Sequence, residues 1–245
     1  MKKIVLISLF VAVISYGMVN TEKLRMNIDQ TGISGDIELS FDVTMGNTEY
    51  ARLKLEPNMV GRFEKHLLFW LNDLSITWKN GDDFINKGYT HLRYNWDFAP
   101  KTSLEFLTQG EFNIARGLES RFLAGAGFRF LSLKRDHMLL ACGLTGMFEY
   151  EETTDGEITQ IPRGSTYLNF SAWKDDKISF SNTAYFQPSF EDFEDYRIMD
   201  EAKFAVTIFG NLSLTFTGTY FFDSQPPDGI KKYDFSLENG LEYSF

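Results

Sequence analysis

The chain has few of the residues that commonly carry redox or metal chemistry, with one cysteine, Cys142, and three histidines among 245 residues. A single cysteine cannot form a disulfide within the chain, nor can it supply a cysteine-based structural zinc site. Basic residues are also outnumbered, because 24 Lys and Arg stand against 34 Asp and Glu. Affinity for duplex nucleic acid rests mainly on Lys and Arg contacts to phosphate, so this balance argues against a nucleic-acid partner. Aromatic residues, by contrast, are plentiful at 16%.

The chain also lacks, after residue 17, any apolar run of the ~20 residues that a membrane-spanning helix needs. Its first residues are typical of an export signal: Lys2 and Lys3 precede an apolar run at 4–14, and small residues flank Tyr16. We expect cleavage after Gly17, and no cysteine follows to receive a lipid anchor. The mature chain then carries 22 Lys and Arg against 34 Asp and Glu, a net charge of −12.

Apolar and polar residues alternate with period two through the rest of the chain, the pattern of strands whose two faces meet different environments. In residues 232–245, for example, aromatic and aliphatic side chains take one face, and charged and hydroxyl side chains take the other. The alternation predicts twelve strands, at 33–45, 49–60, 66–79, 88–98, 103–114, 120–132, 138–150, 165–173, 178–188, 197–209, 212–222 and 232–245.

The connections between these strands point to a membrane barrel. Those after even-numbered strands are short, such as 99–102 and 210–211, whereas several after odd-numbered strands are longer and polar, such as 151–164. Outer-membrane barrels have short periplasmic turns and longer outside loops. We therefore predict an all-β fold, a closed antiparallel up-and-down transmembrane β-barrel over residues 32–245, with 18–31 as a short periplasmic lead-in. Twelve strands fit best, and counts of 10 or 14 remain open.

Several motifs of turns and strand ends occur in order along the chain: 46–49, 123–129, 187–188 with 195–197, 211–214, 226–229 and 240–245. Together they resemble a bacterial family of salt-induced outer-membrane proteins of unknown function, from about residue 32 to the end. The resemblance implies an outer-membrane barrel of uncharacterised role and supplies no catalytic residue. Tyr243 and terminal Phe245 resemble the signal by which Gram-negative barrels are recognised, which implies the barrel-assembly machinery as a partner during biogenesis.

Candidate catalytic and metal-binding residues are sparse. His66 and His137 fall at predicted turns, His91 falls on a polar strand face beside Arg93, and their spacing does not suit a metal site. We expect no metal, no cofactor and no catalytic site. Aromatic residues are expected instead to form girdles at the membrane interfaces, in contact with outer-membrane lipid and lipopolysaccharide; these are Trp70, Trp78 and Trp96 with Tyr243 and Phe245.

The polar strand faces are predicted to line a lumen with twelve acidic and six basic side chains, a net charge of −6. The lumen-facing candidates for function are His91, Arg93, Glu105, Glu111, Arg129, Glu201 and Lys203. In an open lumen this charge would concentrate cations, and in a closed one the charges would form paired networks. Three apolar residues, Leu67, Phe69 and Leu71, would narrow the lumen near the short turns. Twelve strands lie between a filled barrel of eight and an open pore of sixteen.

The leading functional hypothesis is a narrow, weakly cation-favouring channel or a structural envelope protein. One alternative is an outer-membrane hydrolase with His91 or a carboxylate as general base, although the chain has no Gly-x-Ser-x-Gly motif. A second alternative is a soluble periplasmic β-sandwich that binds a ligand. The oligomeric state is left open.

Overall fold

A computed structural model describes residues 19–25, 31–44, 50–79, 83–175 and 177–245. The predicted signal peptide, residues 1–17, lies outside the described residues, as does the turn motif at 46–49.

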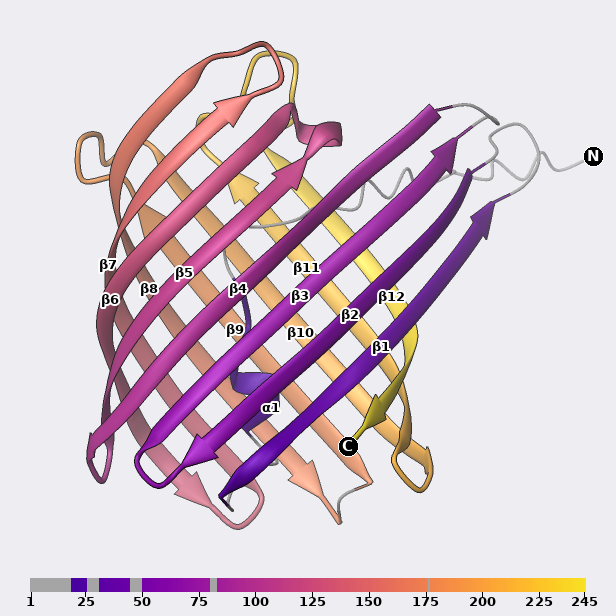
Figure 1. Cartoon of the computed structure of the whole chain (residues 1–245), viewed down its shortest axis with the longest axis vertical. Coiled ribbons are helices and arrows are strands. Elements are labelled where there is room, and N and C mark those ends of the chain that lie inside the picture. The colour runs from indigo at the N-terminus through magenta and orange to yellow at the C-terminus, as the bar shows by residue number, and fades with distance from the viewer. Residues whose placement is uncertain (1–18, 26–30, 45–49, 80–82, 176) are drawn as a thin grey trace, which may run out of the picture.

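The strands form one closed antiparallel ring in which each pairs with its neighbours in sequence and β1 pairs with β12 (Figure 1). This confirms the all-β barrel of twelve strands and excludes the β-sandwich, whose two sheets would leave edges unpaired. No described helix is long and apolar enough to cross a membrane. The elements are α1 (Glu22–Arg25), β1 (Gly32–Thr44), β2 (Tyr50–Phe63), β3 (His66–Lys79), β4 (Asp83–Ala99), β5 (Thr102–Asn113), η1 (Ile114–Arg116), β6 (Leu118–Arg135), β7 (Met138–Thr153), β8 (Ile158–Lys174), β9 (Ile178–Pro188), β10 (Tyr196–Phe209), β11 (Leu212–Asp223) and β12 (Tyr233–Ser244).

Strand lengths differ from the prediction most at β8, and β4, β6 and β7 are also longer than predicted. The polar stretch 151–164 was assigned to a loop, but β7 continues to Thr153 and β8 begins at Ile158. The two strands pair from Glu152 with Ile158 down to Met138 with Ala172. Polar residues occur on both faces at this end of the hairpin, so the period-two signal disappears although the backbone pairing continues.

The outer face is apolar around the whole ring, with side chains such as Ile33 and Leu237 each 65% exposed. Soluble monomers rarely expose contiguous apolar surface on this scale, whereas a transmembrane barrel carries such a band. The predicted girdle residues Trp70, Trp96 and Tyr243 are exposed, and Trp78 is half-buried. Trp70 Nε1 also donates a hydrogen bond of 3.1 Å to Thr90 Oγ1.

The C-terminal residue closes the seam of the barrel. The backbone N–H of Phe245 donates to the oxygen of Gly35, and the N–H of Gly35 donates to the oxygen of Phe245, both at 2.9 Å. The Phe245 ring lies against Gly35, where a Cβ would come within 2.9 Å of it. The terminal residue therefore extends the β1–β12 pairing by one further residue pair.

Deleting Phe245 is expected to lower the yield of folded barrel in the membrane several-fold, because the seam loses two backbone hydrogen bonds and the ring contact. Phe245→Ala, which keeps the backbone bonds, should lose less. The fraction that migrates as a compact band on unheated gels measures this. Equal yields for the deletion and the full chain would contradict the prediction.

Candidate functional site in the barrel lumen

Residues 19–25, which we call the luminal segment, lie inside the barrel near its short-turn end, with α1 between the front and back strands (Figure 1). The sequence predicts a periplasmic lead-in for these residues. The structure places them in the lumen because they carry both apolar and charged side chains that match its inner wall. Val19, Asn20, Thr21, Glu22 and Leu24 are all buried.

Apolar side chains hold one face of the luminal segment. Val19 and Leu24 pack in one buried cluster with Val60 of β2 and with three residues of β3: Leu67, Phe69 and Leu71. The β3 residues are at most 1% exposed. These are the side chains predicted to narrow the lumen, and the luminal segment is what covers them. Covering an apolar side chain of this size stabilises by roughly 1.5–3 kcal/mol.

Ion pairs hold the other face of the segment. Arg129 of β6 donates two hydrogen bonds to the Glu22 carboxylate, from Nε at 2.7 Å and from Nη2 at 2.6 Å. Arg25 lies with its Nε 2.9 Å from Glu22 and its Nη2 3.5 Å from Glu105 of β5. The Arg25 guanidinium also stacks over the Phe69 ring, 4.6 Å from its centroid. Charge-assisted, two-pronged contacts of this kind are among the stronger polar interactions.

Strands β4, β9 and β10 add further hydrogen bonds to the segment. Asn20 Nδ2 donates to Glu201 at 3.0 Å, and Tyr185 OH donates to the backbone oxygen of Val19 at 2.9 Å. Arg93 Nη1 donates to Thr21 Oγ1 at 3.2 Å. The segment is therefore anchored to strands all around the barrel, and it crosses the lumen instead of following one wall.

The pKa of Glu22 predicts that this anchoring weakens in acid. Burial alone would raise that pKa, but Arg129 and Arg25 outweigh burial and lower it from 4.5 to about 2. Because the anchored state has the lower pKa, the stabilisation is complete above about pH 4.5 and is lost as the pH falls toward 2. A difference of this size corresponds to ~3 kcal/mol, or on the order of 100-fold.

We therefore expect hydrogen exchange of residues 19–25, corrected for its intrinsic pH dependence, to show constant protection from pH 7 to 5 and a large loss toward pH 2. Glu22→Gln should show low protection throughout, with no such transition. Protection that stays constant to pH 2 in the unmodified chain would refute the assignment.

A network of buried ion pairs lines the lumen nearer the long loops. Arg197 of β10 contacts Glu149 at 2.7 Å, Glu151 at 3.1 Å and Asp223 at 3.1 Å. Arg163 of β8 joins it through Glu149 at 3.0 Å and binds Asp195 at 2.6 Å. We call this the loop-end network; its members are Glu111, Arg121, Glu149, Glu151, Arg163, Asp195, Arg197 and Asp223.

Two smaller ion clusters occupy the wall formed by β1–β4 and β10–β12. Lys54 lies 2.7 Å from Glu238, 3.0 Å from Glu56 and 3.3 Å from Asp73. Lys203 lies 2.7 Å from Glu38 and 2.5 Å from Glu242. The inner charges are thus paired, as expected for a closed lumen, because unpaired buried charges are costly.

Among the described residues outside the luminal segment, nine Lys and Arg and ten Asp and Glu are buried. Four of these nine bases are missing from the six basic side chains that the sequence predicts for the lumen. Lys87 and Arg163 lay in stretches assigned to loops, Arg197 lay at a strand edge, and Arg121 lay in a strand whose alternation is blurred by glycines. The four are Lys87, Arg121, Arg163 and Arg197.

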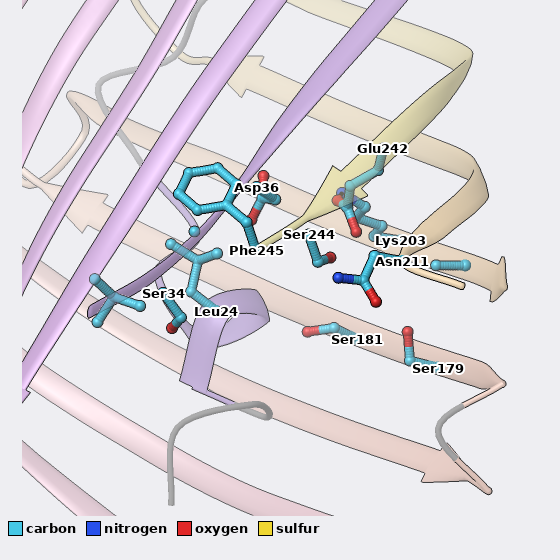
Figure 2. Close-up of a pocket in the computed structure, with 13 residues that line it drawn as sticks. Leu24, Ser34, Asp36, Ser179, Ser181, Lys203, Asn211, Glu242, Ser244 and Phe245 are labelled. Carbon is cyan, nitrogen blue, oxygen red and sulfur yellow. Dashed lines mark hydrogen bonds and ion pairs between the residues drawn. The ribbon is translucent and has the colours of Figure 1, made fainter. Parts of the chain in front are cut away.

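A polar cavity of about 300 Å³ remains beside α1 at the short-turn end. Leu24 and Ser34 lie at one side of it, and Lys203 lies against Glu242 at the other (Figure 2). Ser179, Ser181, Ser244 and Asn211 also line it. The luminal segment thus leaves space for water and small solutes on this side.

The lumen-facing candidates lie on the inner face as follows. Arg93, Glu105 and Arg129 contact the luminal segment, as does Glu201, which is half-buried. Glu111 belongs to the loop-end network and Lys203 to the cluster with Glu38. Their partners Glu22 and Arg25 cannot be predicted from the sequence pattern, because the seven residues of the luminal segment are too few to show a period.

His91 is buried and has a neutral partner, since its Nδ1 lies 2.9 Å from Gln109 Oε1. A general base in a Ser-His pair would have a hydroxyl nucleophile within hydrogen-bond reach. In the part of the chain that the structure describes, no three His, Cys, Asp or Glu side chains are grouped to hold a metal ion. The geometry of His91 therefore gives no support to the hydrolase alternative.

The family model described as "Protein of unknown function, DUF481" matches residues 37–245. The chain belongs to this family. Because the family has no assigned function, membership agrees with the architecture and adds no chemistry. A search among curated proteins gives no match.

Among solved structures, this DUF481 barrel is similar to the translocator domain of the autotransporter NalP from Neisseria meningitidis, with a TM-score of 0.53 and 12% identity over 91% of this chain and 92% of that one. The KdgM porin matches with a TM-score of 0.48 and 13% identity, over 86% of this chain and 99% of that one. The NanC porin matches with a TM-score of 0.47 and 9% identity, over 87% and 98%. At these identities the likeness shows the fold alone.

Proposed function

We propose that the protein is an integral outer-membrane barrel that acts as a narrow channel, closed at rest by its own luminal segment. The observation that carries this is the position of residues 19–25, which cross the lumen and are anchored to both walls. The predicted export signal and the apolar outer band support the location.

Two features favour a luminal segment that can move out of the lumen. Its α-helix has only four residues, and its anchors are side-chain contacts without strand pairing to the wall. Inner acidic side chains that are half-buried would then meet water and favour cations weakly. These are Asp97, Glu201, Asp234, Glu238 and Glu242.

Planar-bilayer recording of the purified mature protein tests this proposal. At neutral pH we expect a closed baseline with brief, small current steps that favour K⁺ over Cl⁻, and a small selectivity ratio. A large, continuously open level would show that the segment does not close the lumen. Clear anion preference would contradict the assigned selectivity.

The paired charges favour one second candidate, a structural envelope protein with a permanently filled lumen. The loop-end network and the luminal segment together would then stiffen the barrel. A protein of this kind would pass no current even when the segment is removed, which separates the two functions.

A further inference from the structure

A second cavity, of about 490 Å³, opens at the short-turn end beneath the luminal segment. It is distinct from the serine-lined cavity and lies against β2–β7. Six basic side chains line it against two acidic ones, Glu64 and Asp97. The six are Arg25, Arg62, Lys65, Lys101, Arg129 and Lys134.

This concentration of positive charge is opposite in sign to the chain as a whole, whose net charge is −10. Of the two acidic side chains that line the cavity, Asp97 pairs loosely, with its Oδ2 3.7 Å from Arg62 Nη2. The Nε of Arg62 is buried without a hydrogen-bond partner. Cations that converge in a concave site attract anions and raise their local concentration.

Leu67, Leu131 and Leu139 also line the cavity. Apolar side chains in the wall lower the local dielectric and strengthen the attraction between an anion and the surrounding bases. A volume of about 490 Å³ exceeds what one phosphate group fills, since a single water occupies about 30 Å³ of liquid. The site therefore suits an anion with several charged groups.

Two of the six bases also anchor the luminal segment. Arg129 and Arg25 line this cavity and both contact Glu22, at 2.6 Å and 2.9 Å. An anion bound in the cavity would meet the same guanidinium groups that hold Glu22. Binding of the anion and anchoring of the segment are then linked, so that each weakens the other.

We propose that this cavity binds a soluble polyanion, with phosphate or carboxylate groups, that enters from the short-turn end and competes with Glu22 for Arg129 and Arg25. The binding stands on the cavity alone, and only its consequence, release of the luminal segment, rests on the proposed function.

Calorimetric titration with sodium tripolyphosphate tests the binding, using full-length protein in a phosphate-free detergent buffer. We expect saturable binding that weakens as NaCl is raised. The variant Lys65→Gln/Lys101→Gln/Lys134→Gln should bind at least tenfold more weakly. A matched control, Lys174→Gln/Lys231→Gln/Lys232→Gln, removes three exposed charges that do not line the cavity and should change affinity less than twofold.

Competition is tested with Glu22→Gln, which should bind tripolyphosphate at least fivefold more tightly. No binding heat, or equal loss in both triple variants, would overturn the site, and unchanged affinity in Glu22→Gln would overturn the competition. Repeating the titration in nanodiscs with and without phosphatidylglycerol identifies the source of the anion: displacement of tripolyphosphate by this lipid would overturn a soluble ligand. Binding of tripolyphosphate without any change in bilayer current would contradict the proposed channel. The assignment of the basic cavity as an anion site would still hold.

Discussion

A chain that lacks residues 19–25 but keeps its export signal is expected to pass sustained current, with an open fraction at least tenfold above that of the full-length protein. The segment is the part of the described chain that crosses the short-turn end of the lumen. Its removal leaves all twelve strands and the seam at Phe245 unchanged. The barrel should therefore still fold, which a compact band on an unheated gel would verify.

The pore in this deletion should remain narrow. The loop-end network stays in place, with Arg197 and Arg163 joined through Glu149. Leu67, Phe69 and Leu71 lose their cover and line the opening. We therefore expect small unit steps, well below those of an open sixteen-stranded pore.

A peptide with the sequence of residues 19–25, added to the deleted protein, supplies the matched control. It should restore closure, and the same peptide with Glu22→Gln should do so less well, because the two bonds from Arg129 depend on the carboxylate. A deletion variant that folds but passes no current would refute closure of the lumen by the luminal segment. It would favour the structural role.

The fold could be predicted from sequence because each strand separates lipid from lumen, which imposes the period of two on every strand. The bounds of β9, 178–188, follow directly from this alternation. Where a strand leaves the membrane the constraint ends, and the start of β8 was placed at 165 instead of 158.

The lumen could be predicted only in part. Alternation shows which side chains face inward. It does not show which of them form ion pairs, because this depends on the curvature of the ring, and no local sequence pattern encodes that curvature. The 165 residues between Glu38 and Lys203 illustrate this, since their contact exists only after closure. The apolar Leu67, Phe69 and Leu71 do carry a usable signal, because buried inward apolar residues require a cover. The stretch before residue 32, which has no predicted strand, is one segment that can provide it.

Replacing Arg197 with alanine is expected to cost about 3–5 kcal/mol of unfolding free energy, the typical effect of breaking a buried ion pair from one side. Arg197 of β10 is buried and contacts three carboxylates: Asp223 of the neighbouring strand β11, and Glu149 and Glu151 of the more distant strand β7. Without it these carboxylates lose a shared cation and repel one another. Arg197→Lys should lower the unfolding free energy by an intermediate amount. Lysine keeps the positive charge but lacks the planar guanidinium that contacts all three carboxylates.

Urea unfolding in lipid vesicles, followed by tryptophan fluorescence, measures the effect of Arg197→Ala as a lower midpoint with an unchanged slope. Arg135→Ala is the matched control, because Arg135 is exposed at a short turn and should stay within about 0.5 kcal/mol of the unmodified chain. A loss below about 1 kcal/mol for Arg197→Ala would mean that water enters the loop end and solvates the carboxylates. The loop-end network would then line an aqueous vestibule, and the luminal segment at the opposite end would be the sole barrier in the described lumen.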